Sequence, residues 1–206
     1  MKFRVLTIAR EYGSGGAEIA GIIAGRLGWT LVDQALLTEV SSRAKVPAGE
    51  VAELDEQVDP WLYRIMRRLW GSGGDGYSAI TPPINLLDAD AVASLTKQVI
   101  QEVYRVGNCV IVGRGAQCVL RGKEDVFHVF VYSEWRDRVH RIEKRLGSGN
   151  NANELIHSMD ASRFEYVHRH YGMSRLDPHL YDLLVNSKRH TGVAAEIILS
   201  AMEILR

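Results

Sequence analysis

Residues 3–27 read FRVLTIAREYGSGGAEIAGIIAGRL. Residues 3–9 form a short run that is rich in aliphatic and β-branched side chains, which predicts a buried parallel strand. A glycine-rich turn follows at once. Apolar residues then recur at three- and four-residue spacing, which predicts a helix with one apolar face; they are Ile19, Ile22, Ile23 and Leu27. The stretch therefore predicts a strand, a tight turn and a helix, the opening unit of an α/β fold.

The rest of the chain repeats this alternation. Hydrophobic patterns predict further strands and helices; the strands are at residues 30–33, 109–112, 126–132 and 182–186, and the helices at residues 34–44, 89–106, 135–146, 152–171 and 193–205. Five strands separated by helices predict a parallel sheet with helices on both faces, and loops gathered at the carboxyl ends of the strands. We expect the functional site at that edge of the sheet.

Composition excludes several classes of protein. The chain has 206 residues, 46% of them hydrophobic, which suits one substantial core and excludes a disordered chain. Its 25 basic and 25 acidic side chains balance, so we expect neither long nucleic acid nor a membrane as partner. No apolar stretch reaches the roughly 18 residues of a membrane span, so we expect a cytoplasmic protein. The sequence leaves its oligomeric state open.

The turn at residues 10–18 lies where a doubly wound fold binds phosphate, between the first strand and the first helix. Glycines let successive backbone N–H groups point inward, and the helix N-terminus adds partial positive charge. An ordinary tight turn is the alternative interpretation. A second Ser-Gly-Gly at residues 72–74 lacks the strand and helix that the first copy has. The candidate phosphate-binding residues are Gly13, Ser14, Gly15, Gly16, Ala17 and Glu18.

This turn departs from the common nucleotide-binding loop G-x-x-x-x-G-K-[ST], in which lysine binds phosphate and a hydroxyl binds magnesium. Gly16 stands at the lysine position, and neither Ala17 nor Glu18 after it supplies the hydroxyl of serine or threonine. A positive charge must therefore come from elsewhere to offset the phosphate charge. Arg10 is the nearest candidate for a catalytic cation. Its alternative role is an ion pair with Glu11 or with a surface acid.

Several motifs together resemble the cytidylate kinase-like family of P-loop proteins. They span nearly the whole chain in order; they are residues 8–16, IAREYGSGG, residues 18–20, EIA, residues 113–116, GRGA, residues 128–131, HVFV, and residues 177–178, DP, with 181–186, YDLLVN. The resemblance implies a three-layer P-loop kinase fold with a helical substrate-binding insertion and an arginine-bearing lid. The resemblance implies a single domain over residues 1–206, with a core formed by residues 1–45, 84–146 and 180–206. The insertion would be about 46–83, whose glycines and prolines also predict mobility, and the lid about 147–179.

The resemblance also implies roles for three arginines. Arg114 corresponds to the arginine of a Gly-Arg-Asp run that holds the acceptor nucleotide, although Gly115 replaces the carboxylate. Asp160 and Arg163 match an Asp-x-x-Arg segment of the lid helix. The resemblance implies that Asp160 binds substrate and that Arg163 and Arg169 are catalytic residues. A simple ion pair between Asp160 and Arg163 is the alternative. Relatives commonly carry a further arginine where this chain has Ala17.

The resulting expectation is a kinase that transfers the γ-phosphate of ATP, with Mg²⁺, to a nucleoside monophosphate such as CMP. The alternatives are a catalytically impaired module that binds phosphate or nucleotide, and a kinase of another small metabolite. Asp33 is a candidate for acceptor binding or for a helix cap, and Glu18 or Asp33 could orient magnesium-bound water. Arg138 and Arg141 are either solvated or turned toward the site. No histidine or cysteine motif predicts a metal site within the protein itself.

Overall fold

The computed structural model describes residues 3–33, 89–147 and 151–205. The chain divides into two compact units, residues 1–33 with 108–206, and residues 34–107. The described part of the second unit includes helix α5 (Ala89–Val106), which has the bounds that the sequence predicts. The predicted insertion at 46–83 and the predicted helix at 34–44 lie outside the described residues.

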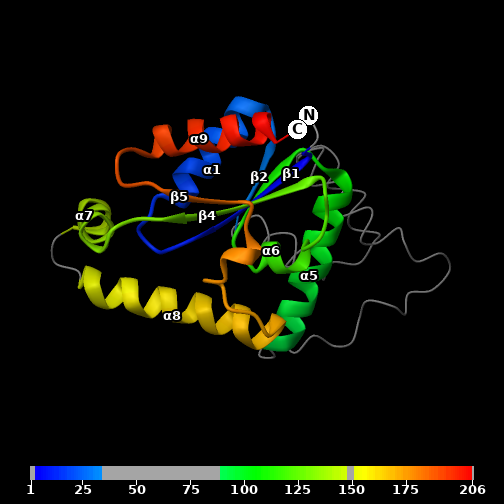
Figure 1. Cartoon of the computed structure of the whole chain (residues 1–206). Coiled ribbons are helices and arrows are strands. Elements are labelled where there is room, and N and C mark those ends of the chain that lie inside the picture. Colours follow the sequence, from blue (N-terminus) through cyan, green and yellow to red (C-terminus); the bar gives the residue numbers. More distant parts are fainter. Residues whose placement is uncertain (1–2, 34–88, 148–150, 206) are drawn as a thin grey trace, which may run out of the picture. The chain divides into compact units, whose positions relative to one another are not determined.

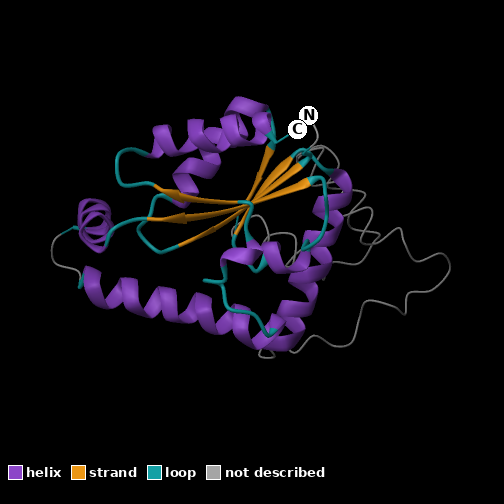
Figure 2. Ribbon diagram, viewed as in Figure 1, coloured by secondary structure: helices purple, strands orange, loops and turns teal. Residues whose placement is uncertain are grey.

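The first unit contains a parallel sheet of five strands, shown in orange in Figure 2. The strands follow one another in space as β2-β3-β1-β4-β5, and all pairs are parallel; they are β1 (Val5–Arg10), β2 (Thr30–Val32), β3 (Cys109–Val112), β4 (Val126–Tyr132) and β5 (Leu183–Asn186). Each lies within two residues of its predicted position. Strand β1 is central, so the loop that follows it emerges in the middle of the sheet edge.

Helices cover both faces of this sheet (Figure 1). Helices α1 (Gly16–Leu27) and α9 (Thr191–Ile204) pack together on one face, and α6 (Ala116–Val119) and α8 (Ala152–Tyr171) lie on the other. Helix α7 (Trp135–Leu146) follows β4 and packs against α8, and a short 3-10 helix, Pro178–Leu180, precedes β5. The α/β fold with helices on both faces is therefore confirmed.

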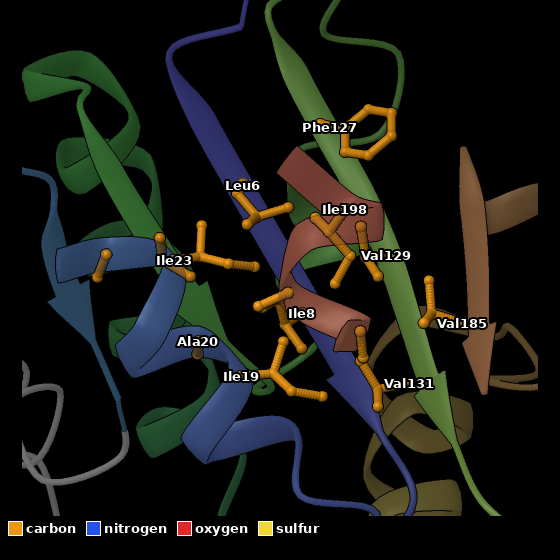
Figure 3. Packing of buried hydrophobic residues seen from close by; sticks show 14 of the residues in the cluster. Leu6, Ile8, Ile19, Ala20, Ile23, Phe127, Val129, Val131, Val185 and Ile198 are labelled. Atoms are coloured by element: carbon orange, nitrogen blue, oxygen red, sulfur yellow. The ribbon is translucent and has the colours of Figure 1, made fainter. Parts of the chain in front are cut away.

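The main core lies between the sheet and helices α1 and α9 (Figure 3). Leu6 and Ile8 of β1 point to this face and pack with Ile19 and Ile23 of α1 and Ile198 of α9, all of them fully buried. Burial of each such side chain contributes about 1.5–3 kcal/mol. This packing fixes helix α1 directly behind strand β1 and so sets the geometry of the loop that joins them.

The opposite face of β1 carries a buried polar pair. Thr7 is the register partner of His128 on β4, and Thr7 Oγ1 lies 2.7 Å from His128 Nδ1. Burial lowers the pKa of His128 from its usual 6.5, an effect that Asp182 partly opposes. The imidazole is therefore held in its neutral form inside the sheet layer.

Among the described helices, none combines the length and the apolar character that a bilayer span requires.

Candidate functional site

The loop between β1 and α1 has the backbone that its glycines predict. Gly13 has φ +81° and Gly15 has φ +79°, a left-handed conformation that other residues rarely adopt. Between them, the backbone N–H and the hydroxyl of Ser14 both donate to the carbonyl of Glu11, at 3.3 and 2.9 Å. The loop thus closes on itself before helix α1 begins at Gly16.

The N–H groups of this loop are largely unused by the protein. Within the described part of the chain, the amides of Gly13, Gly15, Gly16 and Ala17 donate to no acceptor. The first amides of a helix have no partner inside the helix, and they carry the positive end of its dipole. The loop can therefore offer several N–H groups and partial positive charge to one anion.

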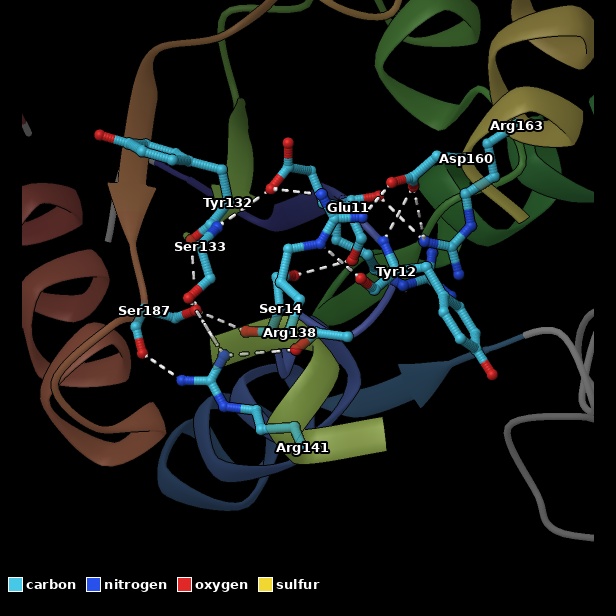
Figure 4. Close-up of polar contacts among 12 residues, drawn as sticks. Glu11, Tyr12, Ser14, Tyr132, Ser133, Arg138, Arg141, Asp160, Arg163 and Ser187 are labelled. Atoms are coloured by element: carbon cyan, nitrogen blue, oxygen red, sulfur yellow. Dashed lines mark hydrogen bonds and ion pairs between the residues drawn. The ribbon is translucent and has the colours of Figure 1, made fainter. Parts of the chain in front are cut away.

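The carbonyl groups of the same loop are held from outside by arginines of α7 (Figure 4). Arg138 Nε donates to the carbonyl of Tyr12 at 2.7 Å, and Arg141 donates to that of Gly13 at 3.3 Å. Arg138 exposes only 5% of its surface. The interpretation of Arg138 and Arg141 as solvated is thus wrong, because both guanidiniums reach back to the loop.

Ser187, directly after β5, holds the next carbonyl. Its hydroxyl, fully buried, donates to the carbonyl of Ser14 at 2.5 Å. Arg141 in turn donates to the carbonyl of Ser187 at 2.5 Å, so helix α7 and the end of β5 support the loop together (Figure 4). The sequence gives little sign of this, since serine after a strand is common.

Arginines from the α8 region hold the start of the loop. Arg163 and Arg175 both donate to the carbonyl of Arg10, at 3.1 and 2.8 Å. Arg175, which exposes 5% of its surface, also stacks on Phe130 with its Cζ 5.6 Å from the ring centroid. Sequence reasoning missed Arg175 because it follows α8 in an irregular segment with no motif.

Asp160 joins these arginines to one another. Its carboxylate accepts from the N–H of Tyr12 at 2.9 Å and from Arg175 at 3.2 Å, and forms an ion pair with Arg138. Arg163 lies 3.9 Å from the same carboxylate. The i,i+3 pair that the sequence offers as an alternative therefore exists, but it is one part of a larger network around the loop.

Glu11 completes the support on the β4 side. Its carboxylate accepts from the N–H of Ser133 at 3.0 Å and lies 3.4 Å from Arg138. The neighbouring Arg10 turns elsewhere, since its guanidinium reaches toward Gly113 at the end of β3. The alternative in which Arg10 pairs with Glu11 is thus not the arrangement in the structure.

The side chain of Arg10 lies among other guanidiniums. Its pKa is lowered to about 9, first by burial and then by the charges of Arg163, Arg175 and Arg114, while Asp33 opposes the shift. Burial likewise lowers the pKa of Arg163. The structure therefore brings Arg10, Asp33, Arg114 and Arg163 into one electrostatic cluster at the carboxyl edge of the sheet. A concentration of like charge of this kind favours an anionic ligand.

Arg114 lies in a constrained turn between β3 and α6. Its φ is +56°, and the glycines on either side also have positive φ, +78° for Gly113 and +70° for Gly115. A side chain at Gly115 would meet the ring of Tyr171 at 2.3 Å. A non-glycine residue in this conformation costs free energy that the surrounding structure must offset.

The remaining predicted residues lie around this cluster. Ala17 and Glu18 are exposed in the first turn of α1, and the carboxylate of Glu18 accepts from the hydroxyl of Thr191 at 2.8 Å. Arg169 is exposed on α8, six residues after Arg163, which places it about 240° around the helix from Arg163. Arg169 therefore lies on a different side of α8 from the arginine that contacts the loop.

A cluster of three or more potential metal ligands is absent from residues 3–33, 89–147 and 151–205.

Comparison with known proteins gives a family and a fold. The sequence model of the cytidylate kinase-like family matches residues 5–189. No curated protein matches the chain. An uncharacterized protein from Eubacterium ventriosum has a similar structure, with a TM-score of 0.67 and 19% identity over 97% of this chain and 98% of that one.

Two enzymes also share the architecture. Shikimate kinase from Bacteroides thetaiotaomicron superposes with a TM-score of 0.53 and 15% identity, covering 97% of this chain and 98% of that one. Shikimate kinase from Acinetobacter baumannii, solved in complex with shikimate, superposes with a TM-score of 0.50 and 10% identity, covering 98% of this chain and 93% of that one. At these identities the likeness shows the fold alone, and it confirms the P-loop kinase fold.

Proposed function

Because this chain belongs to the cytidylate kinase-like family, we propose that it is a small-molecule kinase that binds the phosphates of a nucleotide on the amides of residues 13–17. The proposal rests on one observation. The carbonyls of Arg10, Tyr12, Gly13 and Ser14 are all bonded from outside, while the amides of Gly13, Gly15, Gly16 and Ala17 donate to no acceptor among the described residues. A loop fixed in this way presents donors to an anion without reorganisation, which is what phosphate binding requires.

The arginines at the sheet edge suit phosphoryl transfer. This reaction asks the protein for alignment and charge stabilisation rather than covalent chemistry. Arg10 and Arg163 lie in the same cluster as the loop and would stabilise the transferring phosphoryl group. Arg114, at the end of β3, would hold the anionic group of the acceptor, and Asp33 faces the same cluster from β2. A nucleoside monophosphate such as CMP is the acceptor that we propose.

The donor that we propose is ATP with Mg²⁺. The ion would supply further neutralisation of phosphate charge, held by phosphate oxygens and water. Glu18 and Asp33 are the carboxylates that would orient those waters. The contact between Glu18 and Thr191 fixes one of them beside the N-terminus of α1.

A coupled assay for ADP release tests this proposal, with ATP, Mg²⁺ and a panel of CMP, UMP, AMP, GMP and shikimate. We expect release that depends on one monophosphate and is lost in Arg114→Ala and Arg163→Ala. Arg136→Ala, which removes an exposed arginine of α7, should leave the rate unchanged. If the protein binds neither ATP nor ADP, the proposal is wrong.

A second candidate function is nucleotide binding without transfer. It is favoured because Gly16 replaces the lysine of the common loop, and neither Ala17 nor Glu18 supplies its hydroxyl. ADP or ATP would then raise the melting temperature, since a ligand stabilises the state that it binds. ADP release would stay at background with every acceptor. The two measurements together separate a kinase from a binding module.

A further inference from the structure

The side chain of Arg10 runs through the space beside Gly16. A Cβ atom at Gly16 would lie 2.8 Å from Cβ of Arg10, closer than real Cβ contacts allow, and 3.0 Å from its Cδ, which is a tight contact. Gly16 has an ordinary helical φ, so backbone conformation does not require glycine there. Space does. Because the conflicting atoms belong to the stem of Arg10, the arginine could not yield by moving its tip alone.

The other end of Arg10 reaches the end of β3. A Cβ atom at Gly113 would lie 2.4 Å from one terminal nitrogen of its guanidinium. The side chain therefore runs past the first residue of α1 and ends beside the Gly113–Gly115 turn. Gly16 at the start of α1 and Gly113 after β3, which lack side chains, together leave room for the side chain of Arg10.

Position 16 is where the common nucleotide-binding loop carries lysine. We propose that Arg10 fills the space of that lysine and takes over its role, so that the phosphate-binding cation of this loop comes from the last residue of β1. This inference rests on the proposed function, because it assumes that the loop binds nucleotide phosphate. It also explains why a lysine at position 16 is incompatible with the rest of the loop.

The charges around Arg10 support this role. The charges of Arg163, Arg175 and Arg114 disfavour the charged form of Arg10, and the charge of Asp33 favours it. With a pKa near 9 the guanidinium still carries its proton at neutral pH. Among the described residues, the guanidinium of Arg10 donates no hydrogen bond. A planar guanidinium can bind two phosphate oxygens at once, which suits a polyphosphate.

A double-mutant cycle at positions 10 and 16 tests the inference. ADP affinity is measured by titration calorimetry for the wild type, Arg10→Gly, Gly16→Lys, and the chain with both substitutions; glycine at position 10 removes the Cβ atom that would meet a side chain at position 16. We expect each single substitution to weaken ADP binding by about tenfold or more, and the double variant to bind at least about fivefold more tightly than either single one. Independent losses that multiply in the double variant, or unchanged affinity in Arg10→Gly, would overturn the inference.

A stability cycle tests the shared space without any nucleotide. Gly16→Ala should lower the melting temperature in the wild-type background and raise it when Arg10 is already glycine, since only glycine removes the Cβ atom that lies 2.8 Å from the added one. Gly21→Ala in the same helix is the control, since a Cβ there meets no atom within 4 Å, and it should raise the melting temperature in both backgrounds. Equal effects of Gly16→Ala in both backgrounds would refute the shared space. If wild type does not bind ADP, the proposed function fails and the cation role falls with it, whatever this cycle shows.

Discussion

The backbone N–H of Tyr12 donates to the carboxylate of Asp160 at 2.9 Å, although 148 positions separate the two residues in the chain. The same carboxylate binds Arg138 and Arg175, both of which hold carbonyls of the loop. One acid on α8 therefore orders both the loop and the arginines that support it.

Asp160→Asn should reduce the free energy of unfolding by about 2 kcal/mol, because it weakens charged hydrogen bonds and leaves buried guanidiniums without their counter-charge. Urea denaturation measures the loss. Asp125→Asn is the matched control, since Asp125 pairs with the exposed Arg4 and such pairs contribute at most about 1 kcal/mol. Equal losses in the two variants would contradict the central position of Asp160.

Arg138→Lys should weaken ADP binding by about fivefold or more, since one guanidinium contacts the carbonyl of Tyr12 and the carboxylates of Glu11 and Asp160, and an ammonium cannot span them. Titration calorimetry gives the affinity. Arg136→Lys, exposed on the same helix, should bind ADP as the wild type does. Wild-type affinity in Arg138→Lys would show that the loop keeps its shape without this support.

Ser187→Ala should cost about 1 kcal/mol of unfolding free energy, because the carbonyl of Ser14 would stay buried without its donor. Thermal and urea unfolding both report this change. Ser200→Ala, at an exposed position of α9, should have no cost. A Ser187→Ala protein as stable as the wild type would mean that water replaces the hydroxyl.

Stability should fall as the pH drops below about 6.5. Burial lowers the pKa of His128 in the folded state, so the unfolded chain binds a proton that the folded chain resists. The contribution of neutral His128 to the free energy of unfolding is present above pH 6.5 and is lost as the pH falls below it. His128→Gln should flatten this part of the pH profile between pH 8 and pH 5.5, measured by urea denaturation, whereas His179→Gln, at an exposed position, should not. A profile unchanged in His128→Gln would contradict the prediction.

The fold could be predicted from local patterns because parallel strands and amphipathic helices have distinct periods. All five strands and the long helix α8 lie where hydrophobic spacing places them. The loop could also be predicted, since Gly13 and Gly15 stand between a buried strand and a helix. Both signals are short-range and depend on the chemistry of neighbouring residues.

The support of the loop could not be predicted in the same way. Arg138 and Arg141 occupy a polar helix face, and sequence alone does not distinguish solvent from a distant carbonyl as their partner. Arg175 and Ser187 lie outside any motif, and their roles depend on how α8 and β5 meet the end of β1. Such contacts depend on tertiary packing, which leaves no periodic signal.

The split between bonded carbonyls and available amides has a consequence for engineering. The residues that hold the loop come from α7, α8 and the end of β5, far along the chain from the nine residues that they hold, 10–18. A graft of those nine residues onto another scaffold would therefore carry the glycines but not the conformation. The transplantable module is the whole edge of the sheet.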